Sequence, residues 1–223
     1  MKLFANLTIA VLLLIALSGC GGGGSDFVPT DPNTVFEIEK PGGQSIGSSD
    51  SYTLSGTDSD GDRWTLSISS QVQADTTFLG ESVRSIYAIG QLTYLPTGGI
   101  ANTSVIVYYK YEANGFYLIG YSGDTTTIAN TAKLVPYTGM IGDLGEIGTY
   151  TNNVGDVTTE TWELSDGGNG LANWIVRSTT FDQYGNLIIG TVESALINPD
   201  GTVVSRKATL SYYDFGYTIE FSD

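Results

Sequence analysis

Apolar and polar residues alternate along most of the chain after residue 50, and turn-forming residues interrupt the alternation about every eight to twelve positions. This spacing is typical of antiparallel strands joined by short turns. No window carries the i, i+3, i+4, i+7 apolar stripe of an amphipathic helix, and the nearest candidate, Leu79 to Ile89, is interpreted as a strand. The predicted strands are Ser51 to Gly56, Arg63 to Ser70, Val83 to Leu95, Ser104 to Glu112, Phe116 to Ser122, Ile147 to Thr151, Asp156 to Ser165, Asn173 to Phe181, Leu187 to Asn198, Val203 to Tyr213 and Gly216 to Phe221.

Three turn signals support this pattern. Asn114-Gly115, Gly185-Asn186 and Asp200-Gly201 each lie between two predicted strands, and such dipeptides supply the positive φ angles of tight hairpins. Strands joined in this way pair with their neighbours, and the right-handed twist curls a large sheet. We therefore predict an all-β fold, a single antiparallel meander curled into a barrel, half-barrel or sandwich, with little or no helix after the N-terminal segment.

The N-terminal segment has the layout of an export signal. Lys2 is followed by an apolar run from Leu3 to Leu17 and then by small residues. The run is shorter than the roughly 20 residues that a membrane-spanning helix needs. The residues Leu17-Ser18-Gly19-Cys20 resemble the lipobox of bacterial lipoproteins. The resemblance implies that residues 1–19 are a signal peptide and that cleavage occurs before Cys20. It also implies that the Cys20 thiol carries a diacylglyceryl group and that the mature protein carries two or three acyl chains in all, palmitate among them.

The residue after the cysteine bears on location. It is Gly21, whereas Asp at this place resembles the inner-membrane retention signal of enterobacterial lipoproteins. By that resemblance we expect a lipid-anchored protein of the cell envelope, at the outer membrane of a Gram-negative bacterium. The membrane partner is then reached through the acyl chains and not through the folded body.

A side-chain-poor linker follows the cysteine. Gly21 to Ser25 form a flexible spacer, and the next prolines keep the chain extended or irregular to about residue 45. We therefore expect an acylated linker over residues 20–45 and one all-β domain over residues 46–223, because all-β domains reach this size without division.

Composition excludes several kinds of chemistry. The chain has 24 acidic and 9 basic side chains, a net charge of −15, no histidine and one cysteine. Without histidine there is no Ser-His-Asp or Cys-His pair and no His-ligated zinc. The acidic balance also argues against nucleic acid, whose phosphates need a basic face.

The loop Asp58-Ser59-Asp60-Gly61-Asp62 is the most suggestive local cluster. Alternating carboxylates at Asp58, Asp60 and Asp62 are candidate ligands for Ca²⁺, the one cofactor the sequence suggests. The loop is not an EF-hand, because Gly61 precedes the third acidic position and the twelfth position is Ser69. The favoured interpretation is a polar hairpin tip whose Asp and Gly serve turn geometry.

Glycoside hydrolysis is the enzyme class that the composition still allows, since two carboxylates suffice for it. Four glutamates lie on predicted strands: Glu160, Glu163, Glu193 and Glu220. Strand alternation places Glu160 on the same face as Trp162, which is suited to stacking on a sugar, and Glu163 on the opposite face. Acidic residues on strands are more often the solvated face of a half-buried sheet.

Aromatic residues gather in one predicted hairpin and at the C-terminal end. Tyr109, Tyr111 and Tyr117 in the hairpin, together with Trp162, are candidate binding residues, with Tyr108 on the other face. Ordinary sheet packing by residues of high β-propensity is the alternative, and the favoured one.

One part of the chain is similar in sequence pattern to all-β envelope lipoproteins built as curved antiparallel sheets. It comprises the run from Tyr108 to Tyr121, with Leu134 to Tyr137 and Gly142-Asp143. It also resembles half-barrel lipoprotein carriers, but their plugging helices have no counterpart here, so lipid carriage does not follow.

Two functions remain. The first is a non-enzymatic envelope lipoprotein that binds an envelope protein, a glycan or a small apolar molecule, and the alternative is a carboxylate-based glycoside hydrolase acting on polysaccharide.

Overall fold

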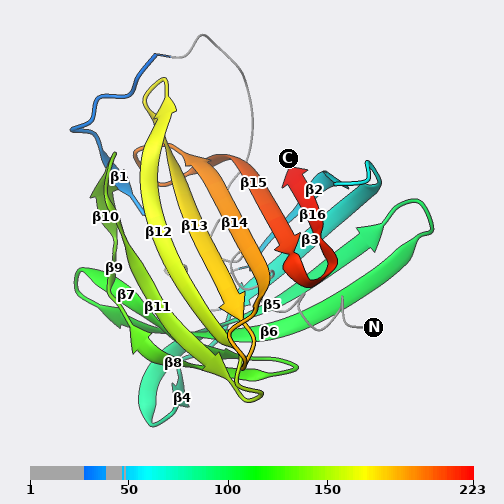
Figure 1. Cartoon of the computed structure of the whole chain (residues 1–223). Coiled ribbons are helices and arrows are strands. Elements are labelled where there is room, and N and C mark those ends of the chain that lie inside the picture. The colour runs from blue at the N-terminus through cyan, green and yellow to red at the C-terminus, as the bar shows by residue number, and fades with distance from the viewer. Residues whose placement is uncertain (1–27, 39–46, 48) are drawn as a thin grey trace.

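The computed structural model of the chain describes residues 28–38, 47 and 49–223, which form an all-β body (Figure 1). The described residues contain no α-helix and one short 3-10 helix, η1 (Tyr213–Phe215). The first strands are β1 (Val35–Glu37), β2 (Ser49–Asp58), β3 (Arg63–Val72), β4 (Thr76–Phe78), β5 (Glu81–Tyr94), β6 (Gly99–Glu112), β7 (Gly115–Ser122) and β8 (Thr126–Ala132). The remaining strands are β9 (Val135–Pro136), β10 (Thr138–Met140), β11 (Leu144–Asn152), β12 (Val157–Gly168), β13 (Leu171–Phe181), β14 (Leu187–Ile197), β15 (Val203–Tyr212) and β16 (Tyr217–Ser222).

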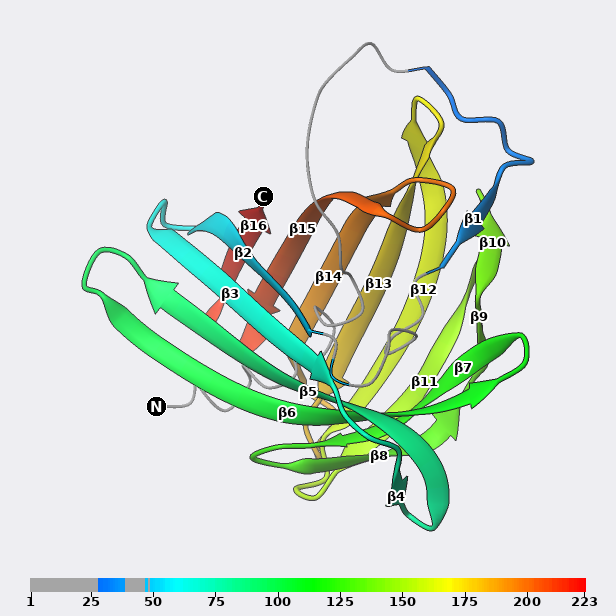
Figure 2. The same ribbon diagram turned by 180° about the vertical axis from the view of Figure 1, so that it is seen from behind.

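Twelve of these strands close into an antiparallel barrel (Figure 2). Their order is β3-β2-β16-β15-β14-β13-β12-β11-β8-β7-β6-β5, and β5 pairs with β3 to complete the ring. The closing pair runs in continuous register from Trp64 opposite Tyr94 to Val72 opposite Ile86. Closure removes the exposed strand edges that an open sheet would leave.

The predicted fold class is confirmed, and the barrel is the form that the meander takes. Segment Leu79 to Ile89 is a strand from Glu81 onward, preceded by a turn in which Leu79 has a φ of 52°. The sequence pattern missed the strands β1, β4, β8, β9 and β10. All of them are short, or too polar to show an alternation of apolar residues.

Hairpins form at all three predicted turn signals, and four of the barrel's hairpin loops share one backbone design. In each, an Asp or Asn is followed three positions later by Gly and four positions later by a polar residue. These loops begin at Asp58, Asn152, Asp182 and Asn198. Their glycines have φ angles of 79–95°, and the Gly amide donates to the carbonyl of the first residue. Gly115 differs, because it lacks a positive φ and is needed for a close approach to Val135.

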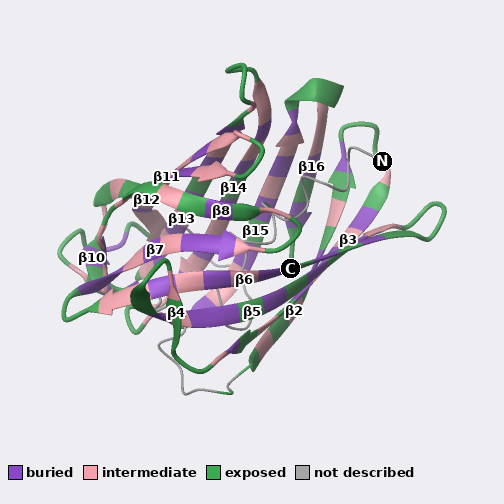
Figure 3. Ribbon diagram, turned by 90° about the horizontal axis from the view of Figure 1, so that it is seen from below, coloured by how far each residue is buried: buried purple, intermediate pink, exposed green. Residues whose placement is uncertain are grey.

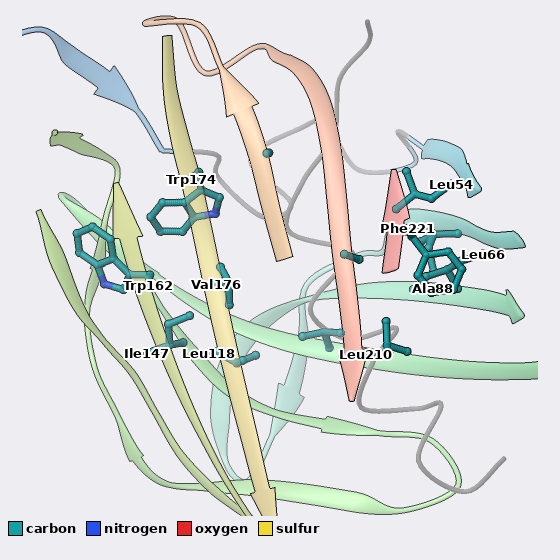
Figure 4. Packing of buried hydrophobic residues seen from close by; sticks show 14 of the residues in the cluster. Leu54, Leu66, Ala88, Leu118, Ile147, Trp162, Trp174, Val176, Leu210 and Phe221 are labelled. Atoms are coloured by element: carbon teal, nitrogen blue, oxygen red, sulfur yellow. The ribbon is translucent and has the colours of Figure 1, made fainter. Parts of the chain in front are cut away.

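The core fills the barrel interior. Buried and more exposed residues alternate along the strands (Figure 3), as expected when one face of each strand points inward. Figure 4 shows two groups of buried side chains projecting from opposite walls, with Leu54, Leu66 and Phe221 in one and Trp162 and Trp174 in the other. Large side chains are required here, since a barrel of twelve strands is wider than the eight-stranded barrels that side chains just fill.

The folded body begins earlier than the expected boundary at residue 46. Phe36 and Ile38 are almost fully buried in the core, and β1 pairs with β10. Thr30 is also buried, and its hydroxyl donates to the carbonyl of Leu171. Part of the segment that we expected to be an irregular linker is therefore packed against the barrel. Its apolar residues are buried in the core, and the prolines nearby in the sequence do not prevent this.

Candidate functional site

A pocket of about 490 Å³ lies at one end of the barrel, where the β2–β3 and β5–β6 hairpins project side by side (Figure 2) and β16 begins. We call it the rim pocket. Its walls are the aromatic side chains of Trp64, Tyr94 and Tyr217, and its floor is formed by Leu92 and Ala101. Three carboxylates also line it: Asp58, Asp60 and Asp62.

Small residues on β6 leave the space for this pocket. In the β5–β6 pair, Tyr94 lies opposite Gly99 and Leu92 lies opposite Ala101. A Cβ added at Gly99 would meet only the Thr97 hydroxyl oxygen, at 3.4 Å. At this end of the barrel, β6 therefore places only small side chains opposite the large aromatic residues of β3 and β5. The space beside the rings stays unfilled and forms the pocket.

The three rings form one cluster. The rings of Trp64 and Tyr94 have centroids 4.7 Å apart with a tilt of 46°, and Trp64 and Tyr217 meet edge to face at 6.2 Å. The β3–β5 register produces the first contact, because it places Trp64 directly opposite Tyr94. Such tilted and edge-to-face pairs are favourable arrangements for aromatic rings.

Asp58 ties the hairpin to the aromatic cluster. Its Oδ1 accepts hydrogen bonds from the backbone amides of Asp60 at 3.0 Å and Asp62 at 2.8 Å, and its Oδ2 accepts from Trp64 Nε1 at 2.7 Å and from the Tyr217 hydroxyl. Burial opposes ionisation of Asp58, but these four donors outweigh it, so the pKa of Asp58 lies below its ordinary value.

Asp62 holds the third ring. The Tyr94 hydroxyl donates to Asp62 Oδ2, and this hydrogen bond, helped by burial and by the nearby negative charges, raises the pKa of Tyr94 to about 12. Burial and the hydrogen bond to Asp58 raise the pKa of Tyr217 as well. Both phenols therefore remain neutral hydrogen-bond donors across the physiological pH range.

The predicted calcium ligands meet in space, but not as a ligand set. Asp58, Asp60 and Asp62 line the same pocket, while both oxygens of Asp58 already accept two hydrogen bonds each. Within residues 28–38, 47 and 49–223, no group of three or more acidic, His or Cys side chains is placed to hold a metal ion. The other three hairpins of this design show the same backbone turn, which supports the turn interpretation of the loop.

The predicted aromatic binding residues do not line the rim pocket. Tyr109 is buried in the core, and Tyr111 packs against it. Tyr117 does not join them, because it pairs with Lys110 and alternates with buried neighbours on β7, which turns it to the outer face. Trp162 is buried, and its ring lies 5.2 Å from that of Trp174.

The four candidate glutamates divide between the two faces, and Glu160 and Glu163 lie on opposite faces as strand alternation predicts. Glu163 faces outward and forms an ion pair with Arg177 at 3.0 Å, and Glu220 is exposed. Glu160 and Glu193 point into the barrel and are 2% and 0% exposed. Burial raises the pKa of Glu160 to about 8, and burial and the charge of Glu160 raise the pKa of Glu193 well above its ordinary value.

Sequence reasoning missed Trp64 and Tyr94 as site residues. Trp64 follows the acidic loop directly, and its inward direction can be read from the alternation with Leu66 and Ile68. Tyr94 is 30 positions away along the chain, and only strand register brings it to Trp64. Cys20, the predicted lipidation site, lies outside the described residues.

Comparisons of the chain with models of protein families, with curated proteins and with solved structures found no match. Among the residues that the structure describes, no helix has the length and apolar character required to cross a membrane.

The buried glutamates predict a pH-dependent stability. An unfolded glutamate loses its proton near pH 4.5, whereas Glu160 keeps its proton up to about pH 8. The folded barrel therefore binds more protons than the unfolded chain between these values, and it loses stability as the pH rises through this window. We expect Glu160→Gln to match the wild type near pH 4 and to be more stable by roughly 2–4 kcal/mol at pH 8.

Urea denaturation at a series of pH values measures this difference. Glu163→Gln is the matched control, because its carboxylate is solvated and ion-paired outside the barrel. The interpretation fails if Glu160→Gln and the wild type lose stability equally between pH 4.5 and pH 8.

The hydrogen bonds of Asp58 predict how the acidic hairpin responds to substitution. In Asp58→Asn the side chain keeps an oxygen for the turn, as Asn152 does in its own hairpin, but its NH₂ cannot accept from Trp64 and Tyr217. Because donors are left without acceptors, we expect the free energy of unfolding to fall by about 1–3 kcal/mol. Asp182→Asn, in an exposed hairpin of the same design, should lower it less.

Thermal unfolding in calcium and in chelator separates this structural role from metal binding. We expect Asp58→Asn to lose the same stability in both conditions. A loss confined to the calcium sample would instead support the calcium site that the spacing of the carboxylates suggested.

Proposed function

We propose that this protein is a lipid-anchored protein of the bacterial cell envelope, whose β-barrel is a non-enzymatic binding domain with its site at the rim pocket. Acyl chains on Cys20 hold the protein at the membrane. The outer membrane is the proposed location because Gly21, and not the Asp of the inner-membrane retention signal, follows Cys20. The observation that carries the binding function is a concave site in which Trp64, Tyr94 and Tyr217 stand over an apolar floor.

The composition of the rim pocket supports a small ligand. Small-molecule sites are concave, mostly apolar and aromatic, and contain a few fixed polar groups, with volumes of roughly 300–1,000 Å³. The rim pocket has about 490 Å³ and fits this description. Its polar groups are held by hydrogen bonds to the hairpin and to the rings, so the site is preorganised and a ligand need not order it.

The buried glutamates do not favour the hydrolase alternative. Glycosidases need one ionised carboxylate and one protonated carboxyl group in contact with a sugar. Glu160 and Glu193 are closed off from solvent, and burial disfavours the ionised form of both. Trp162, the ring suited to stacking on a sugar, packs on Trp174 in the interior.

The anchor rests on the N-terminal sequence. Cys20 is the only cysteine of the chain, and it stands at the position that the lipobox requires. Two or more acyl chains hold a protein stably at a bilayer, whereas one chain binds reversibly. Attachment through Cys20 therefore asks for no membrane-binding surface on the barrel.

Substitution of the cysteine tests the anchor. We expect Cys20→Ser to abolish incorporation of radiolabelled palmitate and to leave an uncleaved precursor, because serine offers no thiol for acylation. The barrel of the variant should still fold. Equal labelling of the variant and the wild type would refute lipidation at this residue.

Filling the rim pocket tests the binding function. We expect the detergent-solubilised protein to bind benzyl alcohol, a neutral aromatic probe, in saturation-transfer NMR. Gly99→Leu places a side chain in front of Tyr94 and should reduce the signal at least fivefold. Asn102→Leu adds the same side chain to the exposed outer face of the same strand and should leave the signal unchanged. Probe that partitions into detergent contributes equally to both variants, so the comparison also controls for it. Equal signals from both variants would remove the rim pocket as the binding site.

A further inference from the structure

We propose that the rim pocket selects small organic cations, of which alkylated ammonium ions are the type. This inference rests on the proposed binding function and adds the chemical class of the ligand. Three aspartates line the pocket, and no lysine or arginine is among the described residues that line it. The local field therefore favours a positive ligand, in a protein whose net charge is already −15.

The orientation of the polar groups on the rings strengthens this preference. Trp64 Nε1 and the Tyr217 hydroxyl are both directed to Asp58, and the Tyr94 hydroxyl is directed to Asp62. Every ring of the cluster thus donates its polar hydrogen to a carboxylate, and the surface left for a ligand is ring carbon. Tyr94 and Tyr217 are half-buried and supply most of this surface, because Trp64 is 9% exposed and packs against both of them. A cation over the face of Trp or Tyr is attracted by the ring quadrupole, and a carboxylate accepting from the ring adds negative charge nearby.

The same hydrogen bonds argue against a bare metal ion. Asp58 Oδ1 accepts two backbone amides and Asp58 Oδ2 accepts two side-chain donors, so the lone pairs of this carboxylate are already used. Asp62 Oδ2 accepts from Tyr94. Calcium would require several free oxygens converging at short distance. An alkylated ammonium ion needs no such ligation, because it responds to charge and to aromatic surface.

The floor of the pocket fits the alkyl part of such an ion. Leu92 and Ala101 offer apolar contact beneath the rings, and Gly99 leaves the space in front of Tyr94 open. A neutral molecule of the same shape would gain this apolar contact but not the attraction to the ring faces and carboxylates. The positive charge should therefore decide affinity among ligands of equal size.

Choline and its neutral carbon isostere, 3,3-dimethyl-1-butanol, test the role of charge. We expect isothermal titration of the detergent-solubilised full chain to give at least tenfold tighter binding of choline at fixed ionic strength. Phosphocholine should bind more weakly than choline, because its phosphate is repelled by the aspartates. Tighter binding of phosphocholine would overturn the inference in favour of a lipid headgroup.

Variants separate a specific site from general acidity. Asp62→Asn removes one charge and keeps an oxygen for Tyr94, and we expect it to lose most of the selectivity for choline over the isostere. Glu220→Gln removes one charge from the exposed face of β16 and should retain that selectivity. Calcium at equal concentration and matched ionic strength should not displace choline, and displacement would overturn the inference in favour of an inorganic cation.

The outcomes also distinguish this inference from the proposed function. Equal affinity for choline and the isostere, or unchanged selectivity in Asp62→Asn, overturns the cation preference while benzyl alcohol binding still supports a binding pocket. Absence of every probe from the wild-type pocket, benzyl alcohol included, overturns both.

Discussion

The pairing of β3 with β5 is the constraint on which the rest of this structure depends. Without it the twelve strands would form an open curved sheet with two exposed edges. The register of this pair also sets Trp64 opposite Tyr94, the contact around which the rim pocket is built. A shift of one residue would turn Trp64 outward, since neighbouring side chains point to opposite faces. Barrel closure and the candidate site therefore depend on the same set of backbone hydrogen bonds.

Closure also explains the polarity of the interior. In a closed ring every second residue of each strand must face inward, whatever its chemistry. Glu160 and Glu193 occupy such positions, and both oxygens of Glu193 lack a hydrogen-bond partner among the described residues. The interior therefore favours the neutral form of both acids. Their burial is a cost that the aliphatic and aromatic core must offset, and it makes the barrel sensitive to pH without requiring that either acid be catalytic.

The sequence revealed the fold class and the longer strands because these depend on local patterns. Alternation and turn residues are properties of a few neighbouring positions, so long strands such as β12 and β14 could be predicted, while the polar β8 could not. The acidic hairpin was also recognised, since its Asp and Gly residues adjoin one another.

The composition of the site was not predictable in the same way. Tyr94 and Tyr217 reach Trp64 through pairings between strands far apart in the chain, and a single sequence does not fix such registers. The face of Tyr117 depended on the register of the β6–β7 hairpin for the same reason. The roles of Asp58 and Asp62 followed only once their ring partners were known, because the same carboxylate spacing suits a calcium loop or a turn.

The proposed selectivity for cations follows from a division of roles between the carboxylates and the rings. Burial opposes the ionisation of Asp58, but its four hydrogen-bond donors outweigh burial and hold the pKa of Asp58 below its ordinary value. Its negative charge therefore persists to a lower pH than that of an exposed aspartate. Those same donors prevent it from ligating an ion directly and fix the rings at their present angles. A carboxylate whose oxygens already accept hydrogen bonds from the protein attracts a cationic ligand through its charge without ligating it. Recognition then falls to the ring faces, which discriminate by shape and by the spread of the ligand's charge.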